Sequence, residues 1–158
     1  GREYSEAKLA RGEYDHWTSA EFTHIAAEQC RREDLAARQA NRLLICDTDA
    51  FATSIWHRRY LGTRSPEVEA IAAARHYALY LLTDVDIPFV QDGTRDGEHI
   101  RHWMHGLFAT ELAAQGRPYA LISGPHEARL ARATKLLDRM CESGSALDQH
   151  CASSPAPR

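Results

Sequence analysis

The 158-residue sequence has no apolar run approaching 18 residues, no basic block and no C-x-x-C pair. Without such an apolar run, no segment is expected to span a membrane, and no signal peptide is visible. The net charge of −3 gives no reason to expect a nucleic-acid partner. The cysteines are scattered, which favours reduced thiols in a cytoplasmic protein: Cys30, Cys46, Cys141 and Cys151.

The sequence also lacks G-x-x-x-x-G-K-[ST], the loop that cradles the phosphates of ATP in P-loop enzymes. It does contain a segment typical of the second part of such a site, the strand whose final acid holds Mg²⁺. Residues 43–47 begin with four apolar side chains, which predicts a short strand buried on both faces. This strand ends in Asp47, and Asp49 follows. An acid at the carboxyl end of such a strand lies where open α/β sheets bind ligands, and P-loop enzymes use it to hold Mg²⁺.

Short apolar runs alternate with helical patterns along the chain. The predicted strands cover 43–47, 78–82 and 119–122. Helices are expected over 18–41 and 50–60, from Ser65-Pro66-Glu67 onward, from 96 or 97 to about 115, and over about 126–140. This alternation predicts an α/β fold with a parallel sheet. We expect one domain over 1–141 and a disordered tail over 142–158.

Asp47 and Asp49 are the leading candidates for chemistry. Mg²⁺ prefers carboxylate oxygen, and phosphoryl transfer needs a base near the acceptor hydroxyl, so two acids at one strand end can divide these tasks. A structural alternative stays open, in which the acids end the strand and Asp49 caps the helix that starts near Ala50.

Two further segments allow both a functional and a structural interpretation. The loop over 91–97 carries Arg95, whose planar guanidinium suits phosphate, so the loop could serve as a lid or could be an exposed polar turn. The first four residues, Gly1-Arg2-Glu3-Tyr4, say nothing alone, and a frayed terminus is the default interpretation.

Taken in order, G-R-E-Y over 1–4, D-T-D over 47–49 and P-F-V-Q-D-G-T-R over 88–95 resemble the kinase domain of NadR-type proteins. That family phosphorylates nicotinamide riboside with ATP and belongs to the P-loop and AAA-type ATPases. The resemblance covers about residues 1–141 and implies a three-layer P-loop kinase-like fold.

The resemblance also implies roles for particular residues. Asp47 would serve Mg²⁺, Asp49 would bind the ribose hydroxyls and act as base, and Arg95 would touch the transferring phosphate. The nucleoside would lie against Arg2, Glu3 and Tyr4. The adenine end of ATP would lie near Ser123 and Gly124. The implied partners are a nucleoside and ATP, and the oligomeric state stays open.

The chain departs from this family in one respect, because members carry a first strand and the phosphate-binding loop before G-R-E-Y. We therefore expect the strands over 43–47 and 78–82 to have unpaired inner edges unless they pair with each other. We also expect residues 1–158 alone to bind ATP poorly and to show no kinase activity. Two alternatives remain: a non-catalytic P-loop module, and a P-loop kinase for another metabolite.

Overall fold

The computed structural model describes residues 2–12, 16–90 and 97–142. The chain divides into two compact units, residues 1–75 and residues 76–158, which we call the helical unit and the sheet unit. No helix among the described residues is long and apolar enough to cross a membrane.

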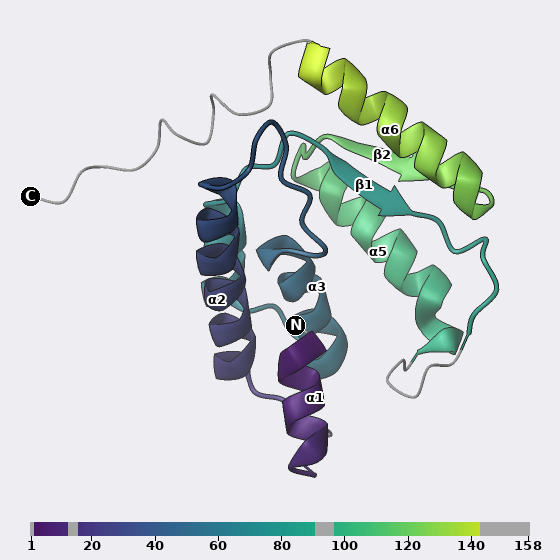
Figure 1. Ribbon diagram of the computed structural model, residues 1–158. Coiled ribbons are helices and arrows are strands. Elements are labelled where there is room, and N and C mark those ends of the chain that lie inside the picture. The colour runs from purple at the N-terminus through teal and green to yellow at the C-terminus, as the bar shows by residue number, and fades with distance from the viewer. Residues whose placement is uncertain (1, 13–15, 91–96, 143–158) are drawn as a thin grey trace, which may run out of the picture. The chain divides into compact units, whose positions relative to one another are not determined.

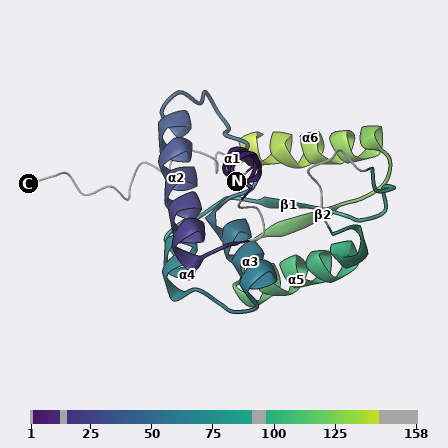
Figure 2. The same ribbon diagram turned by 90° about the horizontal axis from the view of Figure 1, so that it is seen from below.

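The helical unit contains α1 (Arg2–Ala10), α2 (Ser19–Ala37), α3 (Ala50–Leu61) and α4 (Pro66–Ala73). The last three pack against one another (Figures 1 and 2; α4 is labelled in Figure 2). Their buried side chains form the core of this unit: Phe22, Ile25, Ala26, Ala50, Phe51, Ala52, Ile55, Val68 and Ala72. Burial of these apolar surfaces is the main force that holds the three helices together.

The starts of these helices follow the sequence signals. Thr18 and Glu21 form a reciprocal capping box at the start of α2, Asp49 caps α3, and Ser65 caps α4 with Pro66 in the first turn. The predicted helix over 18–41 ends earlier, at Ala37. At the end of α3, Gly62 adopts a φ of 70°, the left-handed conformation that glycine takes without strain.

His57 fastens two elements of this core, and the sequence patterns gave no sign of it. The side chain is 1% exposed. Its Nδ1 lies 2.9 Å from the Thr63 carbonyl oxygen, which can only accept, so Nδ1 donates. Its Nε2 shares a hydrogen bond with the Ser19 hydroxyl at 2.9 Å. This ring therefore joins the start of α2 to the turn after α3.

The sheet unit contains β1 (Tyr80–Thr83), the short helix η1 (Glu98–Ile100), α5 (Arg101–Ala114), β2 (Tyr119–Ile122) and α6 (His126–Glu142). The strands β1 and β2 pair in parallel, with Tyr80 opposite Tyr119 and Thr83 opposite Ile122. Helices α5 and α6 lie on opposite faces of the strands, which makes three layers (Figure 2). The predicted α/β class with a parallel sheet is confirmed.

The predicted strand over 43–47 is wrong. Among the described residues the sheet has two strands, β1 and β2, and residues 43–46 belong to neither. Leu44 and Ile45 are 38% and 71% exposed, so the run is not buried on both faces either. A strand needs a neighbour for its backbone hydrogen bonds, and an apolar run without one does not form a strand.

The other predicted elements are confirmed with small shifts in their ends. The strand expected over 78–82 lies at Tyr80–Thr83, and the helix expected from 96 or 97 to 115 begins as η1 and continues as α5. The predicted helix over 126–140 is α6, which extends to Glu142. Of the tail predicted over 142–158, only Glu142 lies within the described residues.

Candidate functional site

The D-T-D segment forms a tight turn that leads into α3. Asp47 is exposed at its start. Asp49 is 5% exposed, and its Oδ1 accepts the Ala52 N–H at 2.7 Å, while its backbone oxygen accepts the Thr53 hydroxyl at 2.9 Å. The helix-cap interpretation of Asp49 is thus confirmed. A carboxylate at a helix N-terminus is also stabilised by the helix dipole.

Thr48, between the two acids, has a φ of 65°. Among the described residues it is the one non-glycine residue with positive φ. This conformation is unfavourable for a β-branched side chain, and such strain persists where the surroundings enforce it, often at functional sites. The turn is fixed by the Asp49 cap on one side, and Gln29 Nε2 lies 3.4 Å from the Thr48 carbonyl oxygen. With this backbone conformation between them, Asp47 lies in solvent and Asp49 lies in the core.

A cluster of charged side chains around the buried Glu33 lies beside this turn. Glu33 is 5% exposed and receives a hydrogen bond from Gln29 at 2.8 Å. Arg75 Nη2 lies 3.5 Å from a Glu33 oxygen and 2.7 Å from an Asp34 oxygen. Burial, together with the charges of Glu33 and Asp49, raises the pKa of the Cys46 thiol to about 11. A raised pKa disfavours the thiolate, which is the reactive form of cysteine.

Residues 2–4 of the G-R-E-Y segment form the start of α1, so this described part is helical and not frayed. The Tyr4 hydroxyl donates to Glu21 Oε1 at 3.1 Å. Lys8 is 2% exposed, donates to the same oxygen at 2.6 Å and lies 4.6 Å from the centre of the Trp17 ring. For Arg2 and Glu3, the structure describes the backbone and not the side chains.

Glu21 is therefore an anchor for α1 as well as a cap for α2. Its Oε2 accepts from the Thr18 N–H and hydroxyl at 2.8 and 2.9 Å. Burial disfavours its charged form, but the hydrogen bonds from Lys8, Thr18 and Tyr4 outweigh this and lower the pKa of Glu21 to about 2. Sequence reasoning missed Lys8, since its contacts with Glu21, the Trp17 ring and the His16 carbonyl oxygen leave no periodic signal.

Ser123 and Gly124 lie at the carboxyl end of β2, where open α/β sheets bind ligands. Gly124 has a φ of 91°, and α6 begins two residues later. At the corresponding end of β1, Asp84 and Asp86 lie beside this turn, and Asp86 accepts the Gly124 N–H at 2.6 Å. Arg129 of α6 pairs with Asp86. The sequence patterns did not indicate Asp86 or Arg129.

The predicted site residues thus fall into three places. Asp47 and Asp49 share a turn, Tyr4 lies in the cluster around Glu21, and Ser123 and Gly124 lie at the sheet edge of the other unit. Arg95 lies outside the described residues.

The residues that could meet a metal ion are few. Within the described ranges, no group of three or more histidine, cysteine or acidic side chains is arranged to hold a metal ion. Mg²⁺ does not require such a cage, because it is usually held by one or two carboxylates together with water and substrate phosphates. Asp47 fits that role, since its carboxylate is exposed.

Comparison with known proteins points to one family. The sequence matches a protein family described as an AAA domain over residues 1–129. It is also similar to the trifunctional NAD biosynthesis/regulator protein NadR from Salmonella typhimurium and from Escherichia coli, with 28% identity to each over 95 residues. The match covers 60% of this chain and 23% of each relative, so the chain spans about a quarter of their length. No solved structure matches significantly.

Proposed function

Because the chain belongs to the AAA domain family, we propose that it takes part in an ATP-dependent kinase reaction on a ribonucleoside. We propose nicotinamide riboside as the acceptor and nicotinamide mononucleotide as the product. The support for this substrate is the similarity to relatives whose name places them in NAD biosynthesis, together with the resemblance in the G-R-E-Y, D-T-D and P-F-V-Q-D-G-T-R segments.

The observation that carries the proposal is the strained turn at 47–49. It presents one acid to solvent and holds a second against a helix start, two residues apart. A kinase needs a carboxylate that binds the metal and a group that binds the acceptor hydroxyl. The helix cap alone does not explain the strain at Thr48. The capping residue is Asp49, which has extended backbone, and a helix cap does not require a left-handed residue before it.

In this proposal Asp47 would hold Mg²⁺, and the ion would supply positive charge for the phosphates of ATP. Asp49 keeps its bond to Ala52 and accepts a ribose hydroxyl as well, since a carboxylate has room for several donors. As the hydroxyl oxygen bonds to the γ-phosphorus and the bond to ADP breaks, Asp49 takes the hydroxyl proton.

The remaining assignments rest on the resemblance. Arg95 would stabilise charge on the transferring phosphate, which suits its planar fork. The nucleoside would contact the start of α1 at Arg2, Glu3 and Tyr4. A group of half-buried aromatic rings supports this. The centroid of the Trp17 ring lies 6.1 Å from that of Tyr4 and 5.4 Å from that of Tyr60. Aromatic rings stack on flat heterocycles such as a nucleoside base.

A second candidate is a binding module without catalysis. The observation in its favour is that the 158 residues contain no G-x-x-x-x-G-K-[ST], so they lack the backbone donors and the lysine that hold the ATP phosphates. We therefore expect residues 1–158 alone to yield no mononucleotide.

The test compares two proteins with ATP, Mg²⁺ and nicotinamide riboside: residues 1–158, and the protein expressed from its complete reading frame. We expect mononucleotide from the second and none from the first. A panel of other ribonucleosides separates the proposed acceptor from its rivals. Absence of turnover with every acceptor in the complete protein would favour the binding module. Turnover by residues 1–158 alone would show that another loop holds the phosphates.

A further inference from the structure

A side chain of α2 contacts the backbone of the strained Thr48. The φ of 65° is unfavourable for a β-branched residue, so contacts around Thr48 must hold it in that conformation. Its carbonyl oxygen lies 3.4 Å from Gln29 Nε2, and the same nitrogen donates to Glu33 Oε1 at 2.8 Å. An amide nitrogen carries two hydrogens, so Gln29 can serve both acceptors at once. Gln29 therefore connects the turn to a buried carboxylate.

Glu33 is the fixed point of this connection. It is 5% exposed, and a buried carboxylate is costly unless an opposite charge and hydrogen bonds surround it. Arg75, two residues after α4, supplies the charge. Its Nη2 lies 3.5 Å from a Glu33 oxygen and 2.7 Å from an Asp34 oxygen. Because one guanidinium binds two neighbouring acids of α2, the Glu33 carboxylate is held in place.

Glu33 also contacts the residue that precedes the turn. The Cys46 thiol, one residue before Asp47, hydrogen-bonds to Glu33. The same buried carboxylate is thus connected to both neighbours of Asp47, directly to Cys46 and through Gln29 to Thr48. The chain on either side of Asp47 is therefore held from α2, while the Asp47 side chain itself is exposed.

We infer that Gln29 is a positioning residue for phosphoryl transfer. It enforces the left-handed conformation of Thr48, and this conformation sets the directions of the two acids on either side, Asp47 and Asp49. The inference rests on the proposed kinase function, because it requires those acids to act in the reaction. Gln29 contacts the backbone of the turn and no reacting atom, so it is not a catalytic residue. Its effect can still be large, since a displacement of about 1 Å can lower a rate about a hundredfold.

The test measures kcat and the KM values for ATP and the nucleoside in the protein from its complete reading frame. Gln29→Met keeps the length of the side chain and removes its hydrogen-bond donors, so kcat should fall about tenfold or more. Both KM values should change less than about twofold, because the loss affects the placement of the acids in the transition state. Gln29→Asn keeps the amide but is one methylene shorter, so it cannot reach both acceptors and should also lower kcat.

A second substitution separates positioning from a role in the fold. Asn adopts the left-handed conformation more readily than a β-branched residue, so Thr48→Asn makes enforcement of the turn unnecessary. In the Thr48→Asn background, Gln29→Met should therefore change kcat by about twofold at most, which a double-mutant cycle measures. All values are taken at a temperature where thermal unfolding shows every variant to be folded, so differences in stability do not contribute to them.

The matched control is Gln39→Met, which changes an exposed glutamine two residues past the end of α2. It should keep the wild-type kcat with either residue at position 48. Where Gln29→Met does not fold, the same cycle is measured with Gln29→Asn.

The outcomes separate this inference from the proposed function. Wild-type kcat in the folded Gln29 variants overturns the inference, and so does a loss of kcat that is the same with Thr48→Asn as without it. Either result leaves the proposed function intact, because the wild type still phosphorylates the nucleoside. A wild type that phosphorylates a different ribonucleoside overturns the proposed acceptor, and the cycle measured with that nucleoside decides the role of Gln29. A wild type that phosphorylates no acceptor overturns both.

Discussion

Two segments of this chain have the same pattern and different structures. Residues 43–49 and residues 80–86 each carry an apolar run that leads into two acids separated by one residue. The second run contains β1, paired with β2, and its acids follow the strand end. The first run forms no strand, and Ile45 is 71% exposed. An apolar run thus becomes a strand only where another strand supplies its hydrogen bonds.

The acids differ as well. Asp49 turns inward and caps a helix of its own segment, whereas Asp86 is 38% exposed and reaches the backbone of a distant segment, 38 residues away. One acid stabilises a local turn and the other joins two strand ends. The same spacing of two acids after an apolar run therefore does not predict which group each acid binds.

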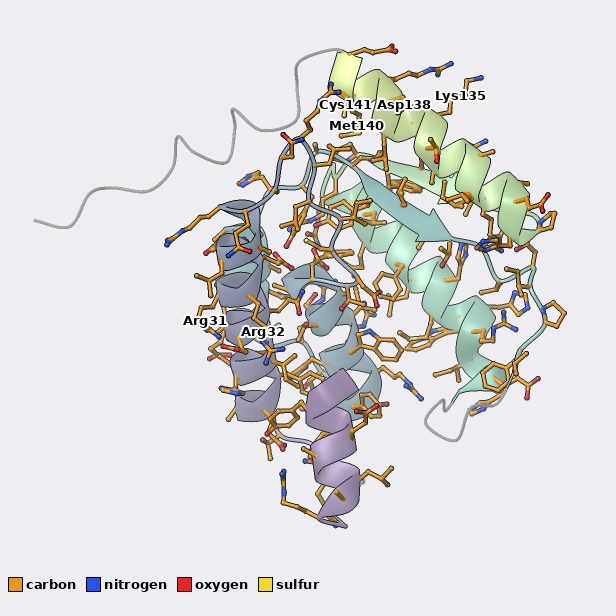
Figure 3. All side chains as sticks on the ribbon, in the orientation of Figure 1. Arg31, Arg32, Lys135, Asp138, Met140 and Cys141 are labelled. Atoms are coloured by element: carbon orange, nitrogen blue, oxygen red, sulfur yellow. The ribbon has the colours of Figure 1, made fainter. Side chains whose placement is uncertain are left out.

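The largest expected effect concerns the chemistry assigned to the first pair of acids. In the protein from its complete reading frame, Asp47→Asn and Asp49→Asn should each lower kcat about a hundredfold or more, as loss of a metal ligand or general base does. Asn caps helices as well as Asp, so the fold should persist in the second variant. Circular dichroism checks the fold. Asp138→Asn, on α6 (Figure 3), is the control with wild-type turnover. Wild-type turnover in both variants would refute the assignment.

The next effect distinguishes the paired run from the unpaired one. Ile122 in β2 is 3% exposed, whereas Ile45 is 71% exposed. Ile122→Ala should lower the free energy of unfolding by about 2–5 kcal/mol, because it leaves a cavity. Ile45→Ala should change it by about 0.5 kcal/mol at most, as for an exposed position. Urea unfolding followed by circular dichroism measures both. Equal losses would mean that Ile45 is covered in solution.

A smaller effect follows from the charge on Glu21, whose pKa is lowered from 4.5 to about 2. Between these values the unfolded chain binds a proton that the folded chain does not, so stability is present above about pH 4.5 and is lost as the pH falls toward 2. The slope from this group is about 1.4 kcal/mol per pH unit at most. Trp103→Phe leaves Trp17 and Trp56, both in the helical unit, so their fluorescence follows its unfolding.

In the Trp103→Phe protein, the further substitution Glu21→Gln should lower the free energy of unfolding at pH 7. The difference in free energy between the two proteins should shrink toward pH 2. A difference that stays constant over this range would show that the carboxylate has an ordinary pKa in the folded protein.

The smallest effect tests the strain at Thr48. Asn tolerates the left-handed conformation better than a β-branched residue, so Thr48→Asn should raise the free energy of unfolding by about 0.5–1 kcal/mol. The matched control is Thr53→Ser, which keeps the hydroxyl that binds the Asp49 oxygen. A destabilised Thr48→Asn protein would mean that the Thr48 side chain contributes more than its backbone costs.

Local signals in the sequence predicted most of the elements but not their contacts. Caps at Thr18, Asp49 and Ser65 are encoded within four residues of each helix start, so the helices could be located. The strand at 43–47 could not be judged, because its existence depends on a partner elsewhere. The same holds for the site, where Arg129 and Asp86 are 43 residues apart and meet only through the strand register.

Helix α6 has no fully buried residue among its 17, and Arg129 ties its start to the sheet. Half-buried side chains recur along one face of the helix as far as Met140 and Cys141. Strand β2, in contrast, carries Ile122, which is 3% exposed. In hydrogen exchange the amides of α6 should therefore open at a lower free energy than those of β2, so that the helix can loosen while the strand pair stays closed.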